Sequence, residues 1–359
     1  MSWYKKIIII LSVLLVLIAV PALIFKARCS GGAYELQQPA MLELPQKEIA
    51  GYARSEESTY LTFPEWYIVY SSEEYANFLK HGRPSQFPYA ASIGQFWSSY
   101  CNVYALTNAK YGFNWENHVM IGVIGVSYSV ELAFKGIYEN TYGWLTEWVS
   151  TATEEDQFAH ALNKEYVAFI YDYPWYLFPY SEKVIQLGHV KHFGQSMLRK
   201  WERRNILNME LWIKTVYGAV IKWSTRTAYG TASTEIYATV QYVPEAVFAD
   251  TRITRIQEHN SHTIIRIPRY RQFTEIVPVL ARQGVQFMNI AGNDEIFLTV
   301  VAPRAWVPEL REGEIVFAMP ILTKPELKRV AMRIPVTSLH AILPALENAG
   351  VTLEHLYDY

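Results

Sequence analysis

The sequence predicts an α+β protein fixed to a membrane, and three observations lead to this prediction. The first is an apolar stretch without any charge at residues 7–25. The second is helical periodicity across residues 59–224, and the third is period-two patterning, with an internal repeat, from Thr234 onward. Together they predict an N-terminal single transmembrane helix, an aromatic-rich helical domain and a C-terminal ferredoxin-like α/β sandwich built from two βαβ repeats.

The apolar stretch at residues 7–25 predicts a membrane anchor. With about 1.5 Å of rise per residue, a helix of this length just crosses the roughly 30 Å hydrocarbon layer. Two lysines precede the stretch, and Lys26 and Arg28 follow it, so the charge balance favours a cytoplasmic N-terminus only slightly, through the free α-amine. A cleaved signal peptide is the alternative, but no small-x-small cleavage site follows directly. We therefore expect a single-pass protein of the cell inner membrane, with the bulk of the chain extracytoplasmic.

Composition limits the classes of function. The formal net charge of −2 gives no reason to expect nucleic acid as a partner. Two cysteines, Cys29 and Cys101, exclude a disulfide-stapled scaffold and a four-cysteine zinc site. We disfavour a disulfide between them, because Cys29 would lie against the membrane. The absence of an Asn-x-Ser/Thr sequon favours a bacterial envelope over a secretory lumen.

Aromatic residues make up 15% of the chain, with 26 Tyr and 11 Trp. Aromatic side chains with a polar tip suit places where apolar and wet surroundings meet, such as a membrane surface or an apolar-ligand cavity. The alternative is a large aromatic core. For the excess as a whole, we favour the interface.

The chain divides into four parts. Residues 1–28 form the anchor, and the polar residues 29–58 form a linker that lifts the folded part off the membrane. Residues 59–232 form the aromatic-rich helical domain, and residues 233–359 form the α/β domain.

Several helices are expected in the helical domain. Pro64 opens the first, with an acid beside it, and residues 90–107 carry aromatic side chains at helical spacing. Thr153 and Asp156 predict a capping box at the start of another helix. Residues 196–223 combine a basic first half with a broad apolar stripe in the second half.

Residues 118–137 are apolar almost all round and have two interpretations, a second membrane span or a buried helix of the domain core. Glu131 and Lys135 lie within this segment, and each would cost roughly 2.5–3.5 kcal/mol near the bilayer centre. Their i,i+4 spacing allows them to pair on one face. We therefore favour the buried core helix.

The C-terminal part contains an internal repeat. The tripeptide Arg-Ile-Pro occurs at residues 266–268 and again at residues 333–335. Each copy continues as a helix, a glycine cap at Gly284 or Gly350, and a strand. A proline within each predicted helix conflicts with this pattern, because it would kink the helix.

Two groups of residues are candidate sites in the helical domain. His160, His189, His192 and Asp156 are candidate metal ligands, because imidazole and carboxylate groups that project into a bundle build di-iron and related sites. A capping or hydrogen-bonding role is the alternative, since glycines near two of the histidines indicate a loop.

The second group surrounds the apolar segment at residues 118–137. His118, Glu131, Lys135 and Glu139 are candidate ligand-binding residues, because ionisable groups near an apolar helix either pair or serve a function. A structural ion-pair network is the interpretation that we favour.

A basic stretch is the candidate membrane-surface element. Arg199, Lys200, Arg203 and Arg204 directly precede the apolar stripe of residues 196–223, and such a combination can lie on anionic lipid. A solvated basic face on a core helix is an equal alternative.

No nucleotide-binding or hydrolase motif occurs, so hydrolase and phosphoryl-transfer functions have no support. We expect a membrane-anchored envelope protein that acts as a scaffold or accessory subunit at the membrane surface, with the lipid bilayer and a membrane protein complex as its partners. One alternative is a protein that binds an apolar small molecule such as a lipid or quinone. The other is a metal-dependent envelope enzyme that uses the histidine and carboxylate set. The sequence indicates no particular cofactor.

Overall fold

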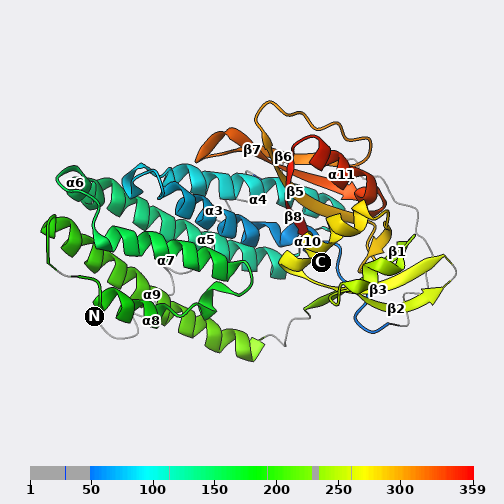
Figure 1. Ribbon diagram of the computed structural model, residues 1–359, viewed down its shortest axis with the longest axis horizontal. Coiled ribbons are helices and arrows are strands. Elements are labelled where there is room, and N and C mark those ends of the chain that lie inside the picture. The colour runs from blue at the N-terminus through cyan, green and yellow to red at the C-terminus, as the bar shows by residue number, and fades with distance from the viewer. Residues whose placement is uncertain (1–28, 30–48, 113, 192, 229–233, 260) are drawn as a thin grey trace.

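The computed structural model describes residue 29 and residues 49–112, 114–191, 193–228, 234–259 and 261–359. It is a mixed helical and sheet protein, 55% helical, with two antiparallel four-stranded sheets. Figure 1 shows the helices gathered at one end of an elongated molecule and the sheets at the other. The predicted anchor at residues 7–25 lies outside the described residues.

The helical region contains eight α-helices within the described residues: α2 (Ser58–Leu61), α3 (Phe63–Phe78), α4 (Tyr89–Tyr111), α5 (Trp115–Tyr138), α6 (Trp144–Trp148), α7 (Glu154–Ile170), α8 (Tyr180–Gly188) and α9 (Met197–Ala228). A π-helical turn, Glu139–Gly143, joins α5 directly to α6. Pro64 lies in the first turn of α3, as predicted. The predicted capping box is also confirmed, since the Thr153 hydroxyl accepts a hydrogen bond from the Asp156 backbone N–H at the start of α7.

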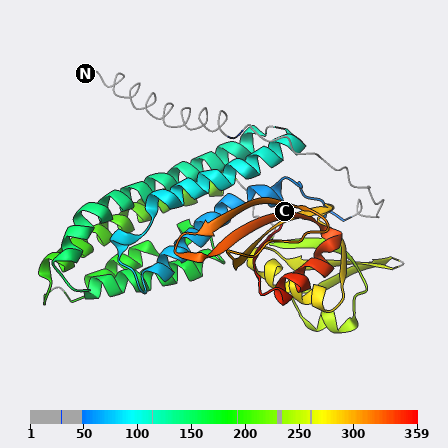
Figure 2. The ribbon, with the colours of Figure 1, turned by 90° about the horizontal axis from the view of Figure 1, so that it is seen from above.

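Helix α5 lies between α4 and α9. The Trp97 indole N–H of α4 donates to the Ser129 hydroxyl of α5 at 2.9 Å, and Lys214 of α9 pairs with Glu131 of α5 at 2.8 Å. On the other side of this layer, α3 packs against α7, and α8 packs against α9. Figure 2 shows α4 and α5 side by side along one edge of the helical region.

Each sheet contains four strands and is associated with one helix. The first sheet has β1 (Glu235–Gln241), β2 (Thr254–His259), β3 (His262–Pro268) and β4 (Gln286–Ile290) in the order β2-β3-β1-β4, with α10 (Tyr270–Arg282) between β3 and β4. The second has β5 (Glu295–Pro303), β6 (Glu314–Ile321), β7 (Lys324–Pro335) and β8 (Thr352–Tyr357) in the order β6-β7-β5-β8, with α11 (Leu339–Asn348) between β7 and β8.

The two sheets also share their register. Glu235 pairs with Pro268 in the first, and Glu295 pairs with Pro335 in the second. In both, the strands that flank the helix are separated by a central strand that is antiparallel to them. The predicted strand, helix, glycine and strand segments therefore occur in two separate sheets, each completed by two further strands.

Both helices of the sheet region continue through their prolines, Pro278 in α10 and Pro344 in α11. In α10, one apolar face is fully buried, and its packing outweighs the backbone hydrogen bond that a proline removes. This face consists of Phe273, Ile276, Val277 and Leu280.

The second sheet joins the two regions because it is buried on both faces. Leu298 and Val300 face a core shared with the first sheet and with α10 and α11. Phe297 points to the opposite face, where it meets Phe63 of α3 at a ring distance of 5.9 Å. The helical region and the sheets therefore form one continuous packed structure.

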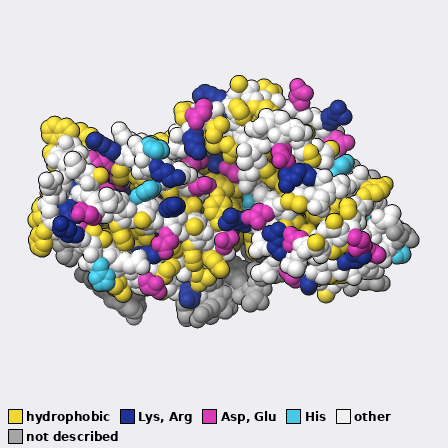
Figure 3. Space-filling view, in the orientation of Figure 1, with side chains coloured by type: hydrophobic (Ala, Val, Ile, Leu, Met, Phe, Trp, Pro, Cys, Tyr) yellow, Lys and Arg dark blue, Asp and Glu magenta, His cyan; other side chains and the backbone are white. Residues whose placement is uncertain are grey.

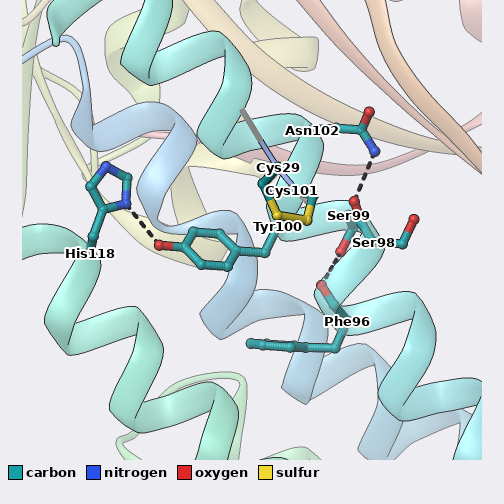
Figure 4. Close-up of a disulfide and its surroundings, with 8 residues drawn as sticks. All are labelled: Cys29, Phe96, Ser98, Ser99, Tyr100, Cys101, Asn102 and His118. Carbon is teal, nitrogen blue, oxygen red and sulfur yellow. Dashed lines mark hydrogen bonds between the residues drawn. A yellow bond between two sulfur atoms is a disulfide. The ribbon is translucent and has the colours of Figure 1, made fainter. Parts of the chain in front are cut away.

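A disulfide connects Cys29 to Cys101 of α4 (Figure 4). Cys29 is buried in a cluster with Tyr100, Tyr104 and Ile121. The expectation that this disulfide is disfavoured was therefore wrong. Cys29 packs against the helical region, so the fold itself brings the two cysteines together.

Candidate functional site

The apolar helix α5 is not the buried core helix that the sequence analysis favoured. Met120–Trp148, which runs from α5 through the π-helical turn to the end of α6, is the one helix in the described part of the chain that is long and apolar enough to cross a membrane. Length and composition are the only grounds for that statement. Only 22% of its apolar window is buried, so most of its apolar side chains lie on the outside.

Seven of the exposed apolar residues of this segment, together with Ser127 and Thr141, follow one pattern. They recur at alternating intervals of three and four residues, which places them in one stripe along the helix. Ser127, which is half-buried, and Thr141 are the polar members. The apolar members are Met120, Val123, Val130, Phe134, Ile137, Trp144 and Trp148.

A second apolar stripe is exposed on the second half of α9. The stripe consists of Met209, Trp212, Ile213, Val216 and Val220. These side chains were predicted as a stripe from the sequence, but not as solvent-facing.

The two stripes face the same side of the molecule. The contacts between α5 and α9 pair Ser127 with Tyr217, Glu131 with Lys214, and residue 135 with residue 210, so the helices are antiparallel. On a helical wheel, each stripe is offset from its contact line by roughly 80–120° in the same rotational sense. Between antiparallel helices, the same sense of offset puts both stripes on one side of the pair.

The end of the helical region extends this surface. Trp144, Leu145 and Trp148 of α6 are exposed, with Trp148 at 73%, and so are Leu198 and Trp201 at the start of α9. Figure 3 shows hydrophobic side chains gathered at the end of the molecule that carries α6. We refer to the exposed apolar side chains of α5, α6 and α9 together as the apolar face.

The predicted ligand-binding cluster is not assembled. Glu131 pairs with Lys214, Lys135 pairs with Glu210 at 3.5 Å, and Glu139 pairs with Arg203. The predicted i,i+4 pair within α5 is therefore replaced by pairs across the α5–α9 contact. These pairs place opposite charges together along the seam between the two stripes of the apolar face.

His118, the fourth member of that cluster, lies near the disulfide (Figure 4). Its Nδ1 is 2.7 Å from the Tyr100 hydroxyl. Burial lowers the pKa of His118 to about 4, because the charged imidazolium is disfavoured away from water. It is consequently neutral at pH 7 and packs as part of the α4–α5 contact.

The basic stretch of α9 is buried rather than spread on the surface. Arg199 is 3% exposed, and Lys200 and Arg203 are each 2% exposed. Arg204 is half-buried and pairs with Glu155 at 2.9 Å. These four side chains are therefore neither a lipid-headgroup surface nor a solvated basic face.

Carboxylates from several helices surround these basic side chains. Arg199 pairs with Asp156 at 2.7 Å, with Glu202 at 3.2 Å and with Glu147 at 3.3 Å. Arg203 pairs with Glu139 at 2.7 Å. Lys200 pairs with two glutamates at the start of α7, residues 154 and 155. We refer to this set as the charge network; it ties the end of α5, α6 and α7 to α9.

Asp156 and Arg203 are among the groups of the charge network whose pKa values are shifted. Burial would raise the pKa of Asp156, but the hydrogen bond and charge of Arg199, together with the charge of Arg203, hold it below its ordinary value. Burial would lower the pKa of Arg203, and the charges of Glu139 and Glu202 raise it instead. Both groups therefore remain charged inside the protein.

The π-helical turn supplies polar groups to the charge network. The Gly143 carbonyl accepts a hydrogen bond from Arg199 at 3.1 Å. A Cβ at position 143 would lie 2.4 Å from the Glu139 carboxylate that holds Arg203. A side chain at this position would therefore displace the Glu139 carboxylate, and the turn directs both the carbonyl and the carboxylate toward α9.

The predicted metal ligands are not brought together. Asp156 is engaged by Arg199 and Thr153, and His189 is an exposed residue at the end of α8. His160 lies in α7, and His192 lies outside the described residues. In the described part of the chain, no group of three or more His, Cys, Asp or Glu side chains could hold a metal ion.

A second buried polar cluster joins the helical region to the sheets. Arg329 of β7 pairs with Glu354 of β8 at 2.7 Å and with Glu74 of α3 at 3.2 Å. Beside it, the ring of His355 lies 3.8 Å from the ring of Trp66, and burial lowers the pKa of His355 to about 3. Arg329 and His355 are buried between the elements, so the cluster fastens the two regions together.

Sequence reasoning missed the solvent-facing role of α5 and α6. The signal that could have revealed it is the alternation of three and four residues from Met120 to Trp148, because the positions in this series include no acid or base. The chain matches no family model, no curated protein and no solved structure. The apolar face must therefore be interpreted from its own geometry.

Proposed function

We propose that the protein is a membrane-anchored envelope protein that acts as a scaffold or accessory subunit at the membrane surface. The observation that carries this proposal is the apolar face on α5, α6 and α9. Soluble monomers rarely expose contiguous apolar patches larger than a few hundred Å², and larger ones mark membrane or protein contact sites. A chain that presents two long apolar stripes on one side needs a non-aqueous surface to cover them.

Two further features support a location at the membrane, with the folded part on its extracytoplasmic side. The apolar stretch at residues 7–25 has the length and composition of a single-pass anchor in the inner membrane. The Cys29–Cys101 disulfide favours an oxidising, extracytoplasmic compartment for the folded part.

The sheet region supports a role in assembly. Its two sheets have the same strand order and register, and we interpret them as a duplicated unit. In each sheet, the helix joins two parallel strands that flank a third, which is the split βαβ arrangement of ferredoxin-like domains. Domains of this kind often make protein contacts, so by analogy we assign this region the contact with a membrane protein complex.

Neither alternative function is favoured by a specific observation. A pocket lined by Val247, Ile253, Ile276 and Leu280 holds about 110 Å³. Sites for drug-sized ligands hold roughly 300–1,000 Å³. The candidate metal ligands of the described residues are dispersed over separate contacts.

The experiment is fractionation of the full chain in a bacterial host. We expect it in the inner-membrane fraction, resistant to alkaline carbonate and released only by detergent. A maleimide polymer should modify the protein only after reduction, because both cysteines are oxidised. The matched control is Leu14→Arg with Leu17→Arg, which places two charges in the apolar stretch. Recovery of the unaltered chain as a soluble monomer without detergent would contradict the proposal.

A further inference from the structure

We infer that the apolar face docks directly on lipid, with the helical region lying along the plane of the bilayer. The partner is the boundary between the headgroups and acyl chains, and α5 and α9 lie flat in it as a pair. This inference rests on the proposed membrane location, and it adds which surface meets the membrane and in which orientation.

The shape of the apolar face fits an interfacial position. From Met120 to Trp148 it follows one side of a continuous helix, which is roughly 42 Å long at 1.5 Å per residue. The apolar stripe of α9 runs beside it. Helices that lie in the membrane interface have an apolar side and a polar side, and the charge network occupies the inner side of α9 here.

The disulfide places the membrane anchor beside the apolar face. Residues 1–28 lead directly into Cys29, which is bonded to Cys101 and packs on Ile121. Ile121 adjoins Met120, the first residue of the stripe. From residue 25 to Cys29 the chain can span at most about 14 Å. The end of the anchor is therefore held close to one end of the apolar face.

The position of Cys101 supports the same orientation. It is half-buried on α4 and follows the exposed residues Gly94 and Ser98 at helical spacing. The exposed sides of α4 and α5 are both turned away from the contact between these two helices. They are turned so that both lie on the same side of the helix pair. A membrane that receives the anchor therefore meets the layer formed by α4, α5 and α9.

Charges and aromatic residues indicate shallow docking rather than a second span. Glu131 is half exposed but paired with Lys214, so the seam of the apolar face carries matched charges. Trp144, Trp148 and Trp212 lie on the face, and tryptophan prefers the headgroup level of a bilayer. A face with paired charges and exposed tryptophans suits the interface, whereas the hydrocarbon centre would penalise the charges.

The test places a nitroxide label at single positions of the full chain in vesicles of phosphatidylcholine and phosphatidylglycerol. Val130→Cys, Ile137→Cys and Val216→Cys report on the apolar face. Ile185→Cys on α8 is matched to Ile137→Cys, since the two isoleucines are 62% and 69% exposed. No reductant is used, so the native disulfide stays closed. All four positions are exposed, so the variants are expected to fold.

We expect the labels on the apolar face to collide with dissolved oxygen several-fold more often than with a water-soluble nickel complex. The label at position 185 should show the reverse order. Equal nickel access at all four positions, in a chain that remains in the vesicles, would overturn the inference and leave the proposed function standing. Strong dipolar coupling between labels on the face would also overturn it, because a second copy would then cover the face. Failure of the chain to enter vesicles would contradict the proposed function as well.

Discussion

In the two halves of α9, charged side chains lie inside the protein and apolar side chains lie outside, which is the reverse of the usual arrangement. The first half carries Arg199, Lys200 and Arg203, and all three side chains lie inside the protein. The second half carries Trp212 and Ile213, which lie outside. The neighbours of a helix therefore decide which of its side chains are buried, since the charged side chains of the first half meet carboxylates, whereas the apolar stripe of the second half is left exposed.

Physical chemistry explains why both halves are tolerated. A buried charge is costly unless partners compensate it, and Arg199 alone has three carboxylates within 3.3 Å. An exposed apolar stripe costs little in the folded chain itself, because its exposure changes little on unfolding. The stripe lowers the solubility of the protein instead, and docking on a membrane removes this disadvantage.

The largest expected effect comes from breaking the charged half. Arg203→Ala removes the partner of Glu139 and leaves that carboxylate buried. Loss of one member of a buried pair typically costs about 3–5 kcal/mol. We expect this loss in the free energy of unfolding, measured by denaturant titration in detergent.

The matched control is Arg252→Ala, which breaks an exposed pair with Asp250 at 2.7 Å. Exposed pairs contribute about 0–1 kcal/mol. Equal effects of the two substitutions would show that the charge network is not a compensated interior, and the comparison between the two halves would fail.

The second prediction concerns His355, a buried group for which the described part of the chain shows no ion pair. The pKa of His355 is about 3 in the folded protein, below its ordinary value of 6.5. Between these values the unfolded chain binds a proton that the folded chain does not, so stability is full above pH 6.5 and falls as the pH falls toward 3. At pH 5 the loss through this residue amounts to about 2 kcal/mol.

The measurement compares the free energy of unfolding at pH 7 and pH 5 for the unaltered chain and for His355→Gln. The variant loses the ring contact with Trp66 at both pH values, so only the difference between them is informative. That difference should be smaller in the variant by about 2 kcal/mol. An unchanged difference would mean that His355 can take up a proton inside the fold.

The third prediction tests the π-helical turn beneath the charge network. Gly143→Ala adds a Cβ that would lie 2.4 Å from the Glu139 carboxylate, so the ion pair with Arg203 must shift. We expect a loss of at least about 1 kcal/mol in the free energy of unfolding. Gly122→Ala in α5 is the control, because no atom of the described residues beyond its own helix lies within 4 Å of its added Cβ. It should stabilise the helix by about 0.5–1 kcal/mol.

Much of the fold could be predicted because its signals are local. The capping box at Thr153 and Asp156 and the buried face of α10 depend on residues a few positions apart. The split of the repeat into two sheets could not be predicted in this way, because β1 and β5 each insert between two strands that come later in the chain.

The site was harder to predict than the fold because its partners are remote. Glu139 precedes Arg203 by 64 residues, so no local pattern announces their pairing. Likewise, 72 residues separate Cys29 from Cys101. The i,i+4 rule suggested that Glu131 pairs within α5, whereas an adjacent helix supplied Lys214. The charged and apolar residues of these segments marked them as candidate sites. Which of their side chains are buried depends on how the helices pack, and this could not be predicted from the sequence.

The smallest expected effect lies on the apolar half of α9. Leu211 and Ile213 are two residues apart on this helix, but Leu211 is 2% exposed and Ile213 is 57% exposed. In detergent, Leu211→Ala should lower the free energy of unfolding by about 2–5 kcal/mol, because it removes buried methyl groups and leaves a cavity. Ile213→Ala should change it by no more than about 0.5 kcal/mol, since the side chain touches the solvent or detergent in both states. A cost near that of Leu211→Ala would show that Ile213 is covered by protein, and it would remove this stripe from the surface that we assign to lipid.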